Sequence, residues 1–216
     1  MTPQTTAALF TRADGSFHFA RWGRPLAPVV FGTDDATLDT IKDAIRTVAG
    51  FGDLRLTETD PELGANLLFF FVADWQDLAQ IANLDRLVPD LAPLLDRLAV
   101  HDANQYRIFR FDPGGAIRVC VIFLRMDTAL GSVPTQVLAT AQMAQSMLLW
   151  SDTAFRDQSP IAILNDSGAA IVRPEIAALI RAAYDPGLPA MSRDPAIAHR
   201  LAARAALLLG DLADGG

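Results

Sequence analysis

The side chains best suited to binding chemistry gather in one segment, residues 134–152 (PTQVLATAQMAQSMLLWSD). A proline at its start and the spacing of its apolar residues predict a long helix. Gln142 and Gln145 occupy neighbouring positions on one side of such a helix, and Ser151 and Asp152 follow at its exit. Their amide, hydroxyl and carboxylate groups are the first candidates for a binding site in a cleft beside the helix.

Zinc proteases place residues on a helix at the same spacing for a physical reason. In H-E-x-x-H, two histidines four residues apart reach one metal ion, and the glutamate between them is the general base. The extended motif adds a glycine and a third histidine. Here the short motif reads Ala141-Gln142-x-x-Gln145, with Leu148 at the glycine and Ser151 at the third histidine. Glutamine is a poor zinc ligand and cannot act as a base, so we expect no metal, no cofactor and no catalytic residue on this helix.

The sequence after this segment resembles an uncharacterised bacterial family, the DUF2927-type family. The resemblance rests on Ser151-Asp152, then on SPIAILND at residues 159–166 and LIRAAYDPGLPAM at residues 179–191. The family pattern has E-E-x-x-Q, a following L-G-L and an aspartate, then an S-I-F-N-D-like segment and an L-Y-D-P…G-M segment. The match covers the last third of the chain, and it implies a zincin-like fold related to metalloproteases.

This copy departs from the family pattern at the positions that would carry chemistry. The two acidic positions hold Ala141 and Gln142, the glycine is Leu148, and the glycine before the methionine is Ala190. The resemblance therefore implies a pseudoenzyme with a degenerate active-site motif. Tyr184, inside the last matching segment, is either an oriented phenol at the cleft or a helix-end residue packed by its ring.

The chain as a whole predicts an α/β (α+β) fold, zincin-like by resemblance: a mixed sheet of about five strands packed by helices, with a helical C-terminal subdomain. The expected strands are residues 26–31, 53–59, 66–72, 106–111 and 116–125, and the main helices are 34–49, 134–152, 175–184 and 195–210. Residues 1–24 are expected to form an arm or edge strand. Prolines divide residues 74–100 into short helices that form an insertion. We expect one domain, residues 1–216, with the sheet in 1–131 and the motif helix and helical subdomain in 132–216.

Composition excludes several classes of partner. A net charge of −7 argues against a nucleic-acid binder. The longest apolar runs, residues 67–73 and 119–124, are far shorter than the ~20 residues that cross a bilayer. The first residues lack the basic and apolar pattern of a secretory leader, so the expected location is the cytoplasm. Cys120 is the single cysteine, which excludes an intrachain disulfide.

Three function hypotheses follow. The first is a non-catalytic, metal-free relative of a metalloprotease whose cleft binds a peptide or protein partner. The second is a hydrolase with an unfamiliar site, built from His101 or His18 with Ser151, Asp152 and Tyr184; it requires a histidine within hydrogen-bond reach of a serine or carboxylate in the cleft. The third is a structural subunit of an assembly, which would expose a large apolar patch.

Overall fold

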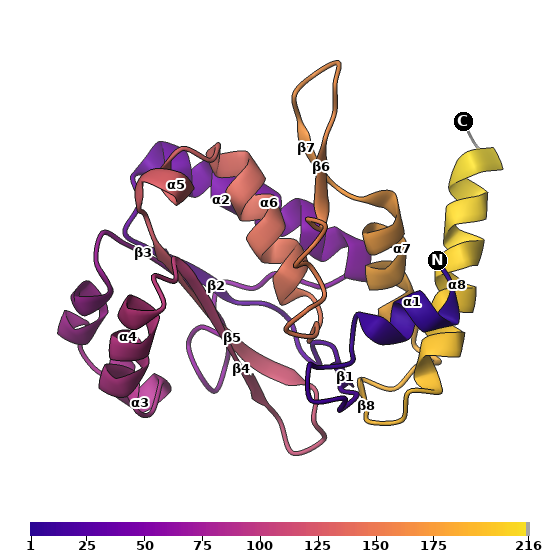
Figure 1. Ribbon diagram of the computed structural model, residues 1–216, viewed down its shortest axis with the longest axis horizontal. Coiled ribbons are helices and arrows are strands. Elements are labelled where there is room, and N and C mark those ends of the chain that lie inside the picture. The colour runs from indigo at the N-terminus through magenta and orange to yellow at the C-terminus, as the bar shows by residue number, and fades with distance from the viewer. Residues whose placement is uncertain (215–216) are drawn as a thin grey trace.

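A computed structural model describes the backbone of residues 1–214 and the side chains of residues 1–210. Its centre is a mixed sheet of four strands in the order β2–β3–β5–β4 (Figure 1). The strands are β2 (Pro28–Phe31), β3 (Leu67–Val72), β4 (Gln105–Phe111) and β5 (Ile117–Arg125). β2, β3 and β5 run parallel, and β4 pairs antiparallel with β5. The predicted α+β class is confirmed, and β4 forms one edge of the sheet.

β5 is the most deeply buried strand of the four-stranded sheet. Every residue from 119 to 124 is buried, as an unbroken apolar run predicts for a strand with both faces covered. Cys120 lies opposite Leu67 of β3 on one side and opposite Phe109 of β4 on the other. β4 turns into β5 through residues 112–115, where Gly115 has a φ of +82° that favours glycine. The strands predicted at residues 106–111 and 116–125 are therefore confirmed, and they form a hairpin.

Two long helices lie side by side across one face of the sheet (Figure 1). They are α2 (Asp35–Ala49), followed by the short η1 (Gly50–Gly52), and α6 (Thr135–Ser146), preceded by α5 (Thr128–Gly131). The Asp34 carboxylate caps α2 by accepting a hydrogen bond from the Thr37 N–H. Ile41 and Ile45 of α2 and Met143 of α6 are buried in the main core. This layer positions α6 beside β4 and β5.

Three short helical segments cover the opposite face. They are η2 (Trp75–Gln80), α3 (Leu84–Leu87) and α4 (Leu91–Val100), which together form the insertion predicted for residues 74–100. Trp75, Leu78 and Leu95 pack with Phe70 and Phe123 of the sheet in a second core cluster. Because helices cover both faces, a ligand can reach the sheet through an edge strand.

The two ends of the chain pack together. The elements concerned are α1 (Pro3–Ala8), β1 (Phe19–Ala20), α7 (Pro174–Ala183), β8 (Met191–Ser192) and α8 (Ile197–Asp214). β1 pairs antiparallel with β8, and α1 contacts α8 (Figure 1). The N-terminal arm thus contains a helix that the sequence did not predict, and it is fixed against the C-terminal helices.

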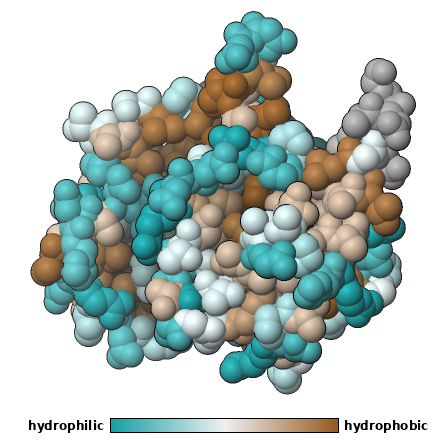
Figure 2. Space-filling model, turned by 45° about the vertical axis from the view of Figure 1, so that its right-hand side comes forward, coloured by the Kyte–Doolittle hydropathy of each residue, from teal (hydrophilic) through white to brown (hydrophobic). Residues whose placement is uncertain are grey.

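A hairpin of β6 (Ile161–Ile163) and β7 (Ala170–Val172) projects from the body of the molecule. Its tip is hydrophilic and the surface below it is hydrophobic (Figure 2). Ile163 and Leu164 are exposed there, whereas other exposed large apolar side chains, such as Phe31 on β2 and Leu207 on α8, lie on separate elements.

The helix predicted for residues 134–152 ends at Ser146, because the next residues pair with the N-terminal arm. The Leu149 N–H donates to the Ala20 carbonyl at 2.9 Å. The Trp22 indole Nε1 donates to the Ser146 carbonyl at 2.8 Å, which satisfies a carbonyl at the end of the helix. These contacts with distant residues cannot be read from helical spacing.

The strand predicted for residues 53–59 does not form, so the sheet has four strands instead of the predicted five. Leu26 forms an isolated parallel bridge with Leu56, since the Leu26 N–H donates to the Arg55 carbonyl and the Thr57 N–H donates to the Leu26 carbonyl. The next donor of this ladder would be the N–H of residue 28, which is a proline and has none. Within the described chain, no helix has the length and apolar character needed to cross a membrane.

Candidate functional site: the cleft at the edge of β4

A cleft of about 1020 Å³ opens along β4, and we name it the β4 cleft. Its walls are β4, the loop that follows α6 and a turn of the N-terminal arm. The lining residues are 105–109 and 111 on β4, Gln145 on α6, residues 149–152, 155 and 156 in the loop, and residues 12–14 in the arm. A cavity of this size has room for a short peptide or a similarly sized ligand.

The edge of β4 that faces away from β5 offers free backbone groups. The Arg125 N–H donates to the Asn104 carbonyl at 2.9 Å. With the register of the two strands, this bond shows which residues of β4 form hydrogen bonds with β5. Bonded and non-bonded pairs alternate in an antiparallel ladder. The N–H and C=O groups of Gln105, Arg107 and Phe109 therefore point away from β5, toward the open edge. Such a row of groups is a template for pairing with another strand.

A network of amides and one guanidinium joins β4 to α6 at the floor of the cleft. Arg107 Nη2 donates to Gln142 Oε1, and Arg107 Nη1 donates to Gln145 Oε1 at 3.3 Å. Gln142 Nε2 in turn donates to Gln105 Oε1. Gln142 is buried beneath the guanidinium, whereas Gln145 lines the cleft. The two predicted glutamines are thus brought together by an arginine that the sequence had not singled out.

The Arg107 guanidinium has no carboxylate partner among residues 1–210. Its Nε is buried without a hydrogen-bond partner. Burial lowers the pKa of Arg107 from its ordinary value. The neighbouring Cys120 thiol is buried as well, and this burial raises its pKa to about 11 despite the opposing effect of the guanidinium. The floor of the cleft therefore holds a positive charge that the described side chains leave uncompensated.

Two further arginines belong to the lining of the cleft. Arg12 and Arg156 line it, and no ion pair to either is formed by the described side chains. The two acidic residues of the lining are already bonded: Asp14 accepts from Ser16, and Asp152 accepts from the Ala13 N–H at 3.0 Å. Three arginines against two aspartates give the cleft a positive balance in a chain of net charge −7.

The predicted Ser151 and Asp152 both line the cleft, and both also fasten the loop to the N-terminal arm. The Ser151 N–H donates to the Leu9 carbonyl at 2.8 Å, and its hydroxyl lies 3.1 Å from the Thr153 hydroxyl. Asp152 holds the arm through Ala13. These contacts keep the wall opposite β4 in place.

Tyr184 is not among the residues that line the cleft, and it packs half-buried against the main core. Its hydroxyl donates to the Met147 carbonyl at 2.8 Å and accepts from the Trp22 N–H at 3.4 Å. Burial raises the pKa of Tyr184 far above its ordinary value. Its ring packs so closely on Gly52 that a Cβ there would lie 2.7 Å from it. Of the two interpretations that the sequence left open, the geometry matches the packed helix-end residue.

The three histidines are dispersed. His18 stacks on Phe111 with ring centroids 5.7 Å apart, and burial, followed by the charges of Arg193 and Arg12, lowers its pKa. His101 follows α4 and His199 lies on α8, both exposed. No histidine is among the lining residues of the cleft. The part of the chain that the structure describes contains no group of three His, Cys, Asp or Glu placed to hold a metal.

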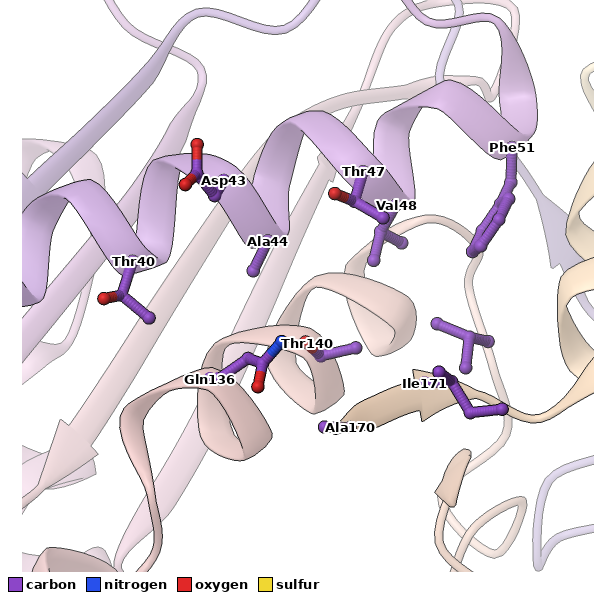
Figure 3. Close-up of a pocket in the computed structure, with 11 residues that line it drawn as sticks. Thr40, Asp43, Ala44, Thr47, Val48, Phe51, Gln136, Thr140, Ala170 and Ile171 are labelled. Atoms are coloured by element: carbon purple, nitrogen blue, oxygen red, sulfur yellow. The ribbon is translucent and has the colours of Figure 1, made fainter. Parts of the chain in front are cut away.

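A second hollow of about 360 Å³ lies between α2 and α6 and is closed by β7 (Figure 3). Its lining is largely small and apolar or hydroxyl-bearing, with Thr40, Thr47 and Thr140 among the polar groups. Asp43, its one acidic lining residue, pairs with Arg46 on the same helix. This hollow has no convergent set of free polar groups, so the β4 cleft is the stronger candidate.

The chain was compared with protein-family models, curated proteins and solved structures, and none of them matches. The geometry of the β4 cleft therefore carries the functional conclusion.

Proposed function

We propose that this protein is a non-catalytic binding protein whose β4 cleft holds an extended segment of a peptide or protein partner. The observation that carries the proposal is the free edge of β4, whose unpaired N–H and C=O groups line a cleft of about 1020 Å³. An extended peptide adds a strand to such an edge, gaining affinity from main-chain hydrogen bonds and specificity from alternate side chains.

The spacing of the free groups sets the length of the bound segment. Gln105, Arg107 and Phe109 are two residues apart, which corresponds to roughly 7 Å between successive pairing positions. A segment of about five residues spans them. Its alternate side chains would point toward α6 and the loop at Trp150, and the others toward Tyr106 and Ile108 on the opposite side.

The resemblance to the DUF2927-type family supports the non-catalytic part of the proposal. In a zincin-like arrangement, the cleft beside the motif helix would be the former substrate groove, and the metal position would lie near Gln142 and Gln145. The Arg107 guanidinium now bonds both of these side chains. A cation in that position repels a metal ion, so we propose that the protein is a metal-free pseudoenzyme.

A display library of random eight-residue peptides would test strand pairing. Selected peptides are synthesised with acetylated and amidated ends, and each backbone nitrogen is methylated in turn. Pairing with β4 predicts that affinity falls at every second position, because only alternate N–H groups face β4. NMR chemical shifts would place the peptide on residues 105–109. Absence of enriched binders, or binding without the alternate pattern, would contradict the proposal.

The non-catalytic part is tested separately. Peptides incubated with the protein, with and without added zinc, are expected to be recovered intact by mass spectrometry. Cleavage that requires the protein would show that the cleft retains catalysis.

A further inference from the structure

Three of the half-buried arginines are paired with acids, namely Arg24, Arg118 and Arg125. Arg24 pairs with Asp60 at 3.2 Å and with Glu62 at 3.3 Å. Arg125 pairs with Asp102 at 2.7 Å. Arg107 has no acid partner: its described partners are two neutral amide oxygens, and its buried Nε has none. Arg21 and Arg173 also bond only to neutral oxygens, but of these three arginines Arg107 alone lines the β4 cleft.

Removing a cation from water without a counter-charge is unfavourable, and a carboxylate beside it offsets that cost. The amide oxygens of Gln142 and Gln145 accept hydrogen bonds from the guanidinium and orient it, but they supply no negative charge. Arg107 is one of the residues that line the β4 cleft, which is large enough to admit a ligand. The missing counter-charge can therefore come from the ligand.

We propose that Arg107 is the receptor for an aspartate or glutamate side chain of the extended segment bound along β4. This inference rests on the proposed function, since it names the chemistry of the same ligand. The geometry follows from the sheet: a residue paired with Arg107 places its side chain on the same face as the guanidinium, with Cβ atoms about 5.5 Å apart. Arg12 and Arg156 at the rim favour further acidic residues on either side.

Gln145 allows the charge of the site to be changed without removing the arginine. Gln145→Glu is nearly isosteric, and the new carboxylate would accept the hydrogen bond from Arg107 and neutralise it. The matched control is Gln136→Glu, which makes the same change on an exposed position of α6 that lines the other hollow. If Gln145→Glu weakens the binding of acidic peptides and Gln136→Glu does not, the loss of affinity is located at Arg107.

Arg107→Gln removes the charge itself, and Arg110→Gln is its control. Arg110 lies on the same strand, three residues along, so its side chain is on the opposite face, and it is exposed. Urea unfolding of each variant establishes that it is folded before binding is measured. If Arg107→Gln does not fold, Gln145→Glu and the peptide comparison below still decide the question.

The binding experiment uses the selected eight-residue peptides, acetylated and amidated, and the same peptides with single glutamates or aspartates replaced by glutamine or asparagine. We expect one acidic position whose replacement weakens binding to the native protein by about tenfold or more, as for a charge-assisted hydrogen bond. The same replacement should change affinity less than about twofold in Arg107→Gln and Gln145→Glu, because the counter-charge is then absent or already neutralised. The control variants Gln136→Glu and Arg110→Gln should retain the full preference for the acidic peptide.

The outcomes separate this inference from the function it rests on. Peptides that pair with β4 but show no acidic preference would overturn the role of Arg107 and leave the proposed function standing. Affinity that depends on a free C-terminal carboxylate, and is lost on amidation, would also overturn the assignment to a side chain. Absence of any peptide on β4 would overturn both.

Discussion

Tyr184→Phe tests whether the phenol is structural. The hydroxyl donates to the Met147 carbonyl at 2.8 Å, and this carbonyl lies beyond the end of α6, where no helical N–H reaches it. Phenylalanine keeps the ring and leaves the carbonyl buried without a donor. An unpaired buried polar group of this kind costs about 1–3 kcal/mol. For a chain of this length, each kcal/mol lowers Tm by roughly 2–4 °C.

Urea unfolding of Tyr184→Phe and of the native protein measures this cost. Tyr106→Phe is the matched control for stability alone: Tyr106 is the other tyrosine and its hydroxyl forms no hydrogen bond with the described residues, but it lines the β4 cleft. We expect a lower free energy of unfolding for Tyr184→Phe alone, with unchanged affinity for β4-bound peptides. Equal stability of the two variants would refute the structural role, and a selective loss of peptide affinity would return Tyr184 to the binding site.

Three further predictions follow from buried or missing groups. Cys120 should not react with a thiol reagent in the folded protein at pH 8, because burial raises its pKa to about 11, and it should react fully once the protein is unfolded in urea. Metal analysis after dialysis should find no stoichiometric zinc; one equivalent that survives dialysis would contradict the metal-free proposal. Burial alone would raise the pKa of Asp60, but hydrogen bonds from the Glu62 and Leu63 N–H groups, Asn66 and Arg24 lower it below 3.8. Because the folded pKa is lower than the unfolded one, stability should fall as pH drops below about 4, and Asp60→Asn should weaken this dependence in acid unfolding.

The strands and helices that bury a continuous apolar stripe could be predicted from the sequence. The apolar runs of β3 and β5 and the apolar stripe of α2 predict which residues of these elements are buried. The turn residues 112–115 predict the hairpin between β4 and β5. The end of α6 could not be predicted, because it depends on Trp22 and Ala20, more than a hundred residues earlier in the chain. The missing fifth strand had a local signal in Pro28, whose lack of an N–H stops the ladder.

The candidate site was predicted only in part, for a related reason. Helical spacing placed Gln142 and Gln145 together, but their partner Arg107 is 35 residues from Gln142 and lies on a different element. A weak signal was present: Gln105 and Arg107 alternate with apolar residues along β4, which puts both on one face. Without the strand order, nothing indicated that this face would meet α6.

In the proposed function, the amides at positions 142 and 145 would make one site both non-catalytic and selective for an acidic ligand. Two glutamates there would neutralise Arg107 and fill its hydrogen bonds, leaving no charge for a ligand. Glutamines accept the same hydrogen bonds while leaving the positive charge in place. In the proposed function, the glutamine at position 142, where the family pattern has an acid, would therefore do more than remove a catalytic base. It would leave a guanidinium at the floor of the cleft whose counter-charge the ligand must bring.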